Sequence, residues 1–221
     1  MKSLLFSFGL LGGILCAAWM DARGSEVDAP DQLPFYTEAT LTPQWFESGS
    51  ASEVPLHRVG SFSLTNQNGK TVSDEDFAEK IRVVAFFFTS CPGICSTMSA
   101  NMVKVQETFR EDERVKLLSF SVMPEVDTVS VLKNYAETYS IRTSKWDLLT
   151  GERKAIYDLA RNSYFAEAET TGANEQGGII HSEKLLLIDP DGHIRGVYNG
   201  TLAFDMRRLI EDVRTLSRAS F

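Results

Sequence analysis

Two cysteines four positions apart, Cys91 and Cys95, are the residues of this sequence best suited to chemistry. They lie in the segment FFFTSCPGIC, directly after an apolar run and around a Pro-Gly pair. Thiolates bind soft metal ions and attack disulfides, so the pair indicates either a metal site or a redox site. A structural disulfide is the plain alternative, but a bond that closes so short a loop contributes little stability.

The spacing within the pair favours a metal site without excluding a redox one. Thioredoxin-type redox sites have two residues between their cysteines, whereas three residues separate Cys91 from Cys95. The wider separation suits a soft metal, which usually takes a third ligand from elsewhere in the chain. We expect Cys95 in the first turn of a helix, where the positive end of the helix dipole would ease its deprotonation.

Three histidines are available as a third ligand. His57 lies in the segment that enters the domain, and His193 follows a turn glycine, where a strand residue needs no special role. His181 comes between an aperiodic loop over 167–178 and an apolar strand, and a loop of that length is more often a functional element than filler. His181 is therefore the predicted third ligand.

Two sulfur ligands and one nitrogen ligand suit Cu(I), and also Cu(II) when a weak further ligand is present. We therefore predict a copper site made of Cys91, Cys95 and His181. Zinc is the competing metal, but a structural zinc site would need four protein ligands, and no fourth cysteine or histidine is evident.

The elements around these residues predict a three-layer α/β domain. Residues 82–90 form a continuous apolar run, typical of a strand buried on both faces of a parallel sheet. Further strands are expected at 61–65, 70–73, 115–123, 145–151 and in a hairpin over 182–200, and helices at 73–80, 96–110, 128–140, 152–162 and 204–218. Functional residues of such sheets gather at the carboxyl ends of the strands, where Cys91 falls.

Length and composition fit one soluble domain with a short leader. The 221 residues are 43% hydrophobic and 24% charged, close to globular averages. The net charge of -8, without a cluster of Lys or Arg, argues against nucleic acid as a partner.

The first 20 residues carry one charge, at Lys2, and then an apolar run. They are predicted to be a signal peptide or an N-terminal membrane anchor, and cleavage and retention are both open. Lipidation at Cys16 is disfavoured, because Gly-Ile-Leu before it fits a lipidation signal poorly. Residues 21–55 are expected to be a tether that lies partly on the domain, and 56–221 the domain itself, on the periplasmic side.

Three segments of the chain resemble motifs of the Sco/SenC copper proteins. FFFTSCPGICSTM resembles their cysteine segment, SVMPEVDT is similar to their S-V-D-P-E-x-D-T, and GGIIHSEKLLLIDPDGHIRGVY resembles their histidine-bearing strand. The resemblance runs in order over residues 55–218. It implies a thioredoxin-like α/β/α fold with a mixed central sheet and an N-terminal β-hairpin, and Cys91, Cys95 and His181 at the copper-ligand positions.

The same resemblance implies a metallochaperone that delivers copper to the binuclear site of cytochrome c oxidase, or a reductase of the thiols there. The expected partners are the copper-bearing oxidase subunit or another cuproprotein, together with a copper donor protein. In the reductase alternative Cys91 and Cys95 are the redox-active pair. A peroxide-scavenging enzyme and a purely structural interaction module are less favoured alternatives.

Two positions depart from the family pattern. Ser96 stands where the family usually has a second proline, and Met123 replaces the acid of the D-P-E motif. A thioether near the site would favour Cu(I), whereas a methionine at a strand end more often packs in a core.

Overall fold

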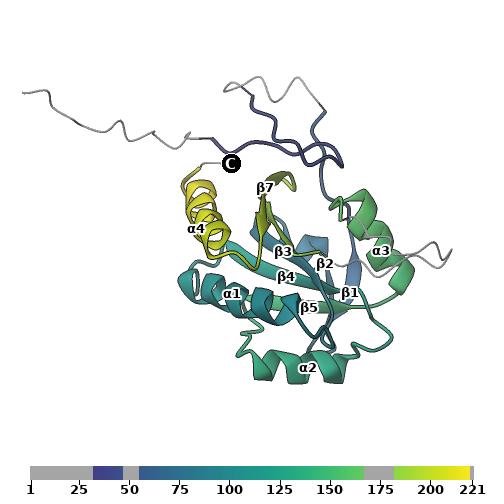
Figure 1. Cartoon of the computed structure of the whole chain (residues 1–221). Helices are drawn as coiled ribbons and strands as arrows, with labels where there is room; N and C mark the ends of the chain where they lie inside the picture. The colour runs from purple at the N-terminus through teal and green to yellow at the C-terminus, as the bar shows by residue number, and fades with distance from the viewer. Residues whose placement is uncertain (1–31, 47–54, 167–181, 220–221) are drawn as a thin grey trace, which may run out of the picture. The chain divides into compact units, whose positions relative to one another are not determined.

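The computed structural model describes residues 32–46, 55–166 and 182–219 (Figure 1). Within these ranges, seven strands form one sheet in the order β2-β1-β5-β4-β3-β6-β7. The strands are β1 Ser63–Asn66, β2 Thr71–Ser73, β3 Ile81–Phe87, β4 Val115–Ser121, β5 Trp146–Thr150, β6 Lys184–Ile188 and β7 Ile194–Asn199. The helices are α1 Ile94–Thr108, α2 Val129–Thr138, α3 Arg153–Asn162 and α4 Ala203–Arg218, with a 3-10 turn, η2, at Asp74–Phe77.

The sheet is mixed, as predicted, because parallel crossovers build its centre and hairpins build its edges. β3 pairs in parallel with β4, and β4 in parallel with β5. β1 and β2 form the predicted N-terminal hairpin, and β6 and β7 form the hairpin at the other edge. β6 runs antiparallel to β3, so β3 lies inside the sheet, between β4 and β6. All seven residues of β3 are buried, which explains its unbroken apolar sequence.

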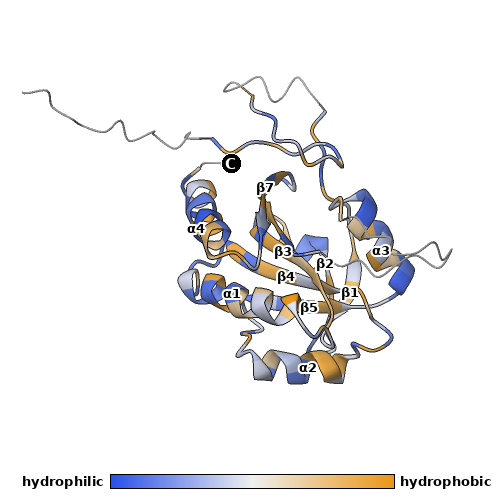
Figure 2. Cartoon of the chain, in the orientation of Figure 1, coloured by the Kyte–Doolittle hydropathy of each residue, from blue (hydrophilic) through white to orange (hydrophobic). Residues whose placement is uncertain are grey.

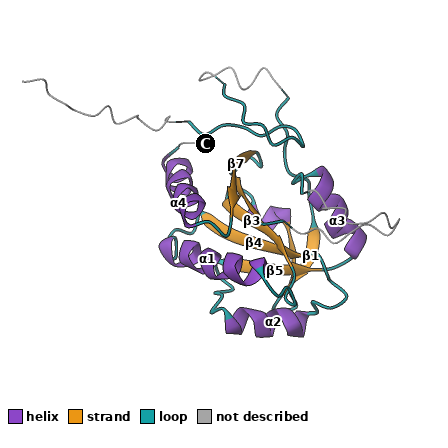
Figure 3. Cartoon of the chain, in the orientation of Figure 1, coloured by secondary structure: helices purple, strands orange, loops and turns teal. Residues whose placement is uncertain are grey.

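Side chains of β3 alternate between two apolar cores. Val83 and Phe87 belong to the core that α1, α2 and α4 cover, whereas Val84 and Phe86 belong to the core that α3 covers. Figure 3 shows α1 and α4 on one side of the sheet and α3 on the other. In Figure 2 the central strands are predominantly hydrophobic, whereas the helices carry polar surfaces. The structure therefore has the three-layer α/β/α arrangement that the sequence predicts.

The helix expected over residues 73–80 is a single 3-10 turn instead. Ser73 precedes it, and its backbone N–H donates to the Asp76 carboxylate at 2.8 Å. Glu79 has a φ of 59°, in the left-handed region, so the chain cannot continue as a helix into β3. Sequence periodicity did not reveal this early end.

The described part of the predicted tether lies on the domain. Arg195 of β7 donates to the backbone oxygens of Leu33, at 2.6 Å, and Pro34, at 3.0 Å. Its guanidinium also lies 3.9 Å from the ring centroid of Phe35. Residues 33–35 are thus fastened beside the start of β7. The leader at 1–20 lies outside the described residues, and among the residues described no helix has the length and apolar character needed to cross a membrane.

Candidate metal centre at the carboxyl edge of the sheet

The cysteine pair lies where β3 ends and α1 begins, as predicted. β3 ends at Phe87 and α1 begins at Ile94, so Cys91 lies in the connecting loop and Cys95 in the first helical turn. The backbone N–H of Cys91 donates to the Phe88 carbonyl at 3.4 Å. Ser96, at the position of the expected second proline, donates through its hydroxyl to the Gly93 carbonyl at 2.7 Å. This bond ties the first turn of α1 back to the loop.

The two thiols differ in exposure and are in contact. Cys95 is only 4% exposed, whereas Cys91 is partly exposed. The side chains of Cys91 and Cys95 are hydrogen-bonded to each other, and no disulfide joins them. The loop therefore brings two sulfur atoms together at the carboxyl edge of the sheet, one of them in a partly exposed residue.

The expectation that the helix dipole eases deprotonation of Cys95 is wrong for this structure. Burial raises the pKa of the Cys95 thiol to about 12, although a backbone hydrogen bond with Phe88 opposes the change. The neighbouring Cys91 and the negative charge of Asp127 raise the pKa further. Loss of hydration at a nearly buried sulfur outweighs the favourable field of the helix terminus.

His181 and the loop at 167–178 lie outside the described residues. The strand that follows them, β6, pairs with β3, and Leu185 lies opposite Ala85. Because the two strands are antiparallel, the start of β6 lies beside the end of β3, where the cysteine pair follows. Among the described residues, no group of three His, Cys, Asp or Glu side chains gathers as metal ligands would.

The other two histidines have structural partners. A ring nitrogen of His57 lies 2.8 Å from the Ser163 carbonyl oxygen, and its ring packs on Phe165 at 4.3 Å between centroids. His193 faces the buried Asp189 carboxylate, with 3.3 Å between Nδ1 and Oδ2. His193 lies in the β6–β7 turn, at the opposite end of the sheet from the cysteines. Both rings therefore have hydrogen-bonding partners within the fold.

Asp127 is a residue of this site to which the sequence reasoning gave no role. Its side chain is fully buried in the segment between β4 and α2. It accepts hydrogen bonds from the Thr89 hydroxyl at 2.5 Å, the Thr89 backbone N–H at 3.1 Å and the Ser121 hydroxyl at 2.6 Å. The sequence did contain a signal for this role, because Asp127 follows β4 closely and β4 ends beside β3, the strand that precedes Cys91.

Met123 lies in the same β4–α2 segment and is partly exposed. Its backbone N–H donates to the Ser121 hydroxyl at 3.1 Å, and its carbonyl accepts from the backbone N–H of Asp127 at 2.9 Å. Its side chain is part of neither apolar core. The core-packing explanation for this methionine therefore has no support among the contacts of the two cores.

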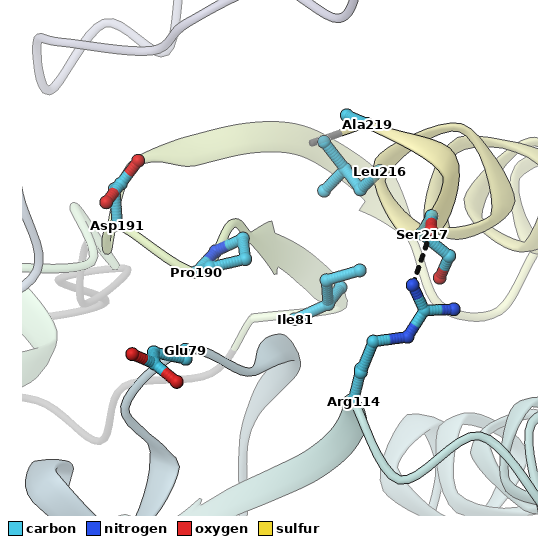
Figure 4. Close-up of a pocket in the computed structure, with 8 residues that line it drawn as sticks. All are labelled: Glu79, Ile81, Arg114, Pro190, Asp191, Leu216, Ser217 and Ala219. Atoms are coloured by element: carbon cyan, nitrogen blue, oxygen red, sulfur yellow. Dashed lines mark hydrogen bonds between the residues drawn. The ribbon is translucent and has the colours of Figure 1, made fainter. Parts of the chain in front are cut away.

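A cavity of ≈ 450 Å³ lies at the other end of the sheet (Figure 4). Ile81, the first residue of β3, contributes to its wall, and Arg114 spans it to donate to the Ser217 carbonyl at 2.6 Å. Glu79 and Asp191 also line the cavity. The residues that line the cavity include no cysteine or histidine. Among the described residues, the thiols that could attack a disulfide or bind a soft metal are those of Cys91 and Cys95, after the end of β3.

The family model described as SCO1/SenC matches residues 51–218. A curated relative, the SCO1 protein homolog of Bacillus subtilis, is 34% identical over 172 residues, which cover 76% of this chain and 88% of the relative. The match includes both cysteines and the histidine-bearing segment.

Three solved structures have the same fold. A SCO1/SenC family lipoprotein from Bacillus anthracis is 31% identical with a TM-score of 0.65, over 73% of this chain and 96% of its own. BsSco, described with a disulfide switch and as a cytochrome c oxidase assembly protein, is 31% identical with a TM-score of 0.63, over 74% and 95%. Copper-bound ScoI from Bradyrhizobium japonicum is 26% identical with a TM-score of 0.59, over 71% and 98%. The chain belongs to the SCO1/SenC family.

Proposed function

We propose that this protein is a copper-binding metallochaperone for assembly of the binuclear copper site of cytochrome c oxidase. The observation that carries the proposal is the contact between the Cys91 and Cys95 side chains at the carboxyl edge of β3. The relatives add support, since one is described with copper bound and another as an oxidase assembly protein.

The donor set of this edge fits copper as a cargo. Two thiols in contact offer two soft ligands, which favour Cu(I). Because the pKa of Cys95 is raised by burial, binding must displace its proton, and copper affinity should increase with pH. Cys91 is partly exposed, so an acceptor thiol can approach the ion from its side and exchange ligands without releasing it.

His181 is the proposed third ligand. It immediately precedes Ser182, the first described residue before β6. The pairing of β6 with β3 brings the start of β6 to the end of β3, where the cysteine loop, residues 88–93, begins. An imidazole there would complete a site with two sulfurs and one nitrogen. The same set would also hold Cu(II) with a weak further ligand.

Thiol-disulfide reduction of a cuproprotein partner is the second candidate function. The observation that favours it is the unequal burial of the two sulfurs. The accessible Cys91 thiolate would attack a sulfur of the partner disulfide and form a mixed disulfide, with one partner sulfur leaving as a thiolate. Cys95 would then attack Cys91, release the second partner thiol and leave a Cys91–Cys95 disulfide. The disulfide switch described for BsSco is consistent with such a pair.

The expected partners follow from the cargo. They are the copper-bearing oxidase subunit or another cuproprotein as acceptor, and a copper donor protein. The apolar leader at 1–20 supports export to the periplasmic side, with cleavage or retention as an anchor. The lipoprotein description of the Bacillus anthracis relative fits a membrane-attached location.

Anaerobic titration of the reduced full-length protein with copper tests the proposal. One equivalent of copper should bind to the wild type, and none should bind tightly to Cys95→Ser. The copper affinity of His181→Ala should be at least about tenfold weaker, because even the loss of a residue that only supports a metal ligand costs that much affinity. Equal binding by the wild type and Cys95→Ser would contradict the copper site. Equal binding by His181→Ala would remove the assignment of that residue alone.

A further inference from the structure

We propose that Asp127 is a positioning residue, whose buried carboxylate holds the cysteine loop in the geometry that brings Cys91 and Cys95 together. This inference rests on the proposed function only for its copper readout, because the contact between the two sulfurs exists without an ion. The fold alone does not explain a fully buried carboxylate at this edge.

The Asp127 carboxylate accepts hydrogen bonds from the loop that carries Cys91. Thr89 lies two residues before Cys91, and both its hydroxyl and its backbone N–H donate to Asp127, at 2.5 and 3.1 Å. The Asp127 carboxylate thus fixes the backbone and the side chain of one loop residue. Because hydrogen bonds to an ionised acceptor are stronger than neutral ones, Thr89 is held tightly.

Asp127 is itself held by hydrogen bonds with Ser121 and Met123. The Ser121 hydroxyl, at the end of β4, donates to its carboxylate at 2.6 Å, and the backbone N–H of Asp127 donates to the Met123 carbonyl at 2.9 Å. The backbone N–H of Val122 also donates to the Phe87 carbonyl, at 2.9 Å. The Asp127 carboxylate is therefore hydrogen-bonded to β4 as well as to the cysteine loop, so it fixes the loop relative to that strand.

The helix that carries Cys95, α1, also has a side-chain contact with α2. The hydroxyl of Ser99, on α1, lies 2.7 Å from the hydroxyl of Tyr135, on α2. The ring of Tyr135 packs against Phe87, the last residue of β3, with 5.4 Å between centroids. Cys91 and Cys95 thus lie between two fixed points, Thr89 and Ser99. The negative charge of Asp127 is also among the causes that raise the pKa of Cys95.

Alternative explanations predict different substitutions to be harmful. If Asp127 only stabilised the fold, any loss at the site should follow the loss of stability. If it positions the loop, Thr89→Val should alter the site because it removes the hydroxyl donor, whereas Thr89→Ser should preserve it because the donor remains. Asp127→Asn should alter the site as well, because an amide presents one acceptor oxygen to donors that occupy two.

The test measures two properties of the full-length protein well below its unfolding temperature. The first is the equilibrium constant of the Cys91–Cys95 disulfide with glutathione, which needs no metal. The second is the absorption spectrum and affinity of the copper-loaded protein. Asp127→Asn and Thr89→Val should change the disulfide constant by about tenfold, as expected for loss of a hydrogen bond to a charged group. Both should shift the copper spectrum, and Thr89→Ser should match the wild type.

Asp147→Asn is the matched control. Asp147 is also a buried carboxylate with a hydrogen bond, from Asn66 at 2.8 Å, but it lies on β5 beside the N-terminal hairpin. Asp147→Asn should leave both site properties unchanged. Wild-type disulfide constants in Asp127→Asn and Thr89→Val would overturn the inference, whatever the copper result. Failure of the wild type to bind copper, with the disulfide constants shifted, would refute the proposed function and keep the inference.

Discussion

The Thr89 hydroxyl lies 2.5 Å from a carboxylate oxygen of Asp127, although the two residues are 38 positions apart in the chain. This contact joins the loop after β3 to the segment after β4. Parallel pairing of β3 with β4 produces it, because the two strands end side by side at one edge of the sheet. The contact thus links the loop that carries Cys91 to a neighbouring crossover of the fold.

The unequal burial of the sulfurs predicts which cysteine attacks a disulfide. Cys95→Ser, mixed with a disulfide-bonded cuproprotein domain, should accumulate a covalent adduct through Cys91, because the resolving thiol is absent. Non-reducing gel electrophoresis and mass spectrometry measure the adduct. Cys91→Ser is the control and should form little adduct, since Cys95 is nearly buried. Adduct formation through Cys95 alone would reverse the assignment.

Met123, in the β4–α2 segment that also carries Asp127, is predicted to influence the choice of copper oxidation state. Replacing it with Asp should shift the relative affinity from Cu(I) toward Cu(II), because a carboxylate is a harder ligand than a thioether. Met123→Leu separates ligation from size and should weaken Cu(I) binding without strengthening Cu(II) binding. Competition titrations with ligands specific for each oxidation state give the ratio. Identical ratios in all three proteins would show that this side chain does not influence the ion.

The buried ion pair of Asp189 predicts a stability change at acid pH. Burial by itself would raise the pKa of Asp189, but hydrogen bonds from His193 and the charge of Arg195 hold that pKa below its ordinary value. A depressed pKa in the folded state stabilises the protein above the unfolded-state pKa, about 3.9. That contribution is lost as the pH falls toward the lower folded-state pKa.

Asp189→Asn should therefore be less stable than the wild type at pH 7, and the difference should shrink below about pH 4. Urea unfolding at several pH values measures it. The variant also leaves Arg195 without its buried charge partner, so the loss at pH 7 should reach about 3 kcal/mol, as for broken buried pairs. A difference that stays constant from pH 7 to pH 3 would contradict this account.

The aromatic cluster under α3 predicts where the core is most sensitive. Phe120 is fully buried, with its ring centroid 5.3 Å from those of Phe62 and Phe86. Phe120→Ala should lower the free energy of unfolding by about 3–5 kcal/mol. Phe204→Ala is the control, because Phe204 is 62% exposed and its loss should change stability by at most about 0.5 kcal/mol. Chemical denaturation compares the two, and equal losses would refute this description of the core.

The sequence predicted those parts of the fold that depend on periodicity and local turn chemistry. The apolar run of β3, the two edge hairpins and the inner face of α1, with Met98, Met102 and Val105 buried, follow from residue type and spacing alone. The position of Cys95 in the first turn of α1 was also predictable, because Cys91-Pro92 favours an extended residue before a helix.

Other features depend on tertiary contacts that leave no local pattern. The Thr89–Asp127 contact requires the register of two strands, and polar residues in loops give no periodic signal. The raised pKa of Cys95 depends on how much solvent the surrounding fold excludes, which outweighed the helix dipole. Docking of residues 33–35 uses backbone carbonyls as acceptors for Arg195, and any sequence supplies such acceptors.

X-ray absorption of the copper-loaded, reduced full-length protein tests the central claim most directly. The account predicts that the ion is coordinated by two sulfur atoms and one imidazole nitrogen, with the nitrogen lost in His181→Ala and no two-sulfur coordination in Cys95→Ser. A wild-type spectrum with oxygen and nitrogen ligands only, unchanged in both variants, would contradict it.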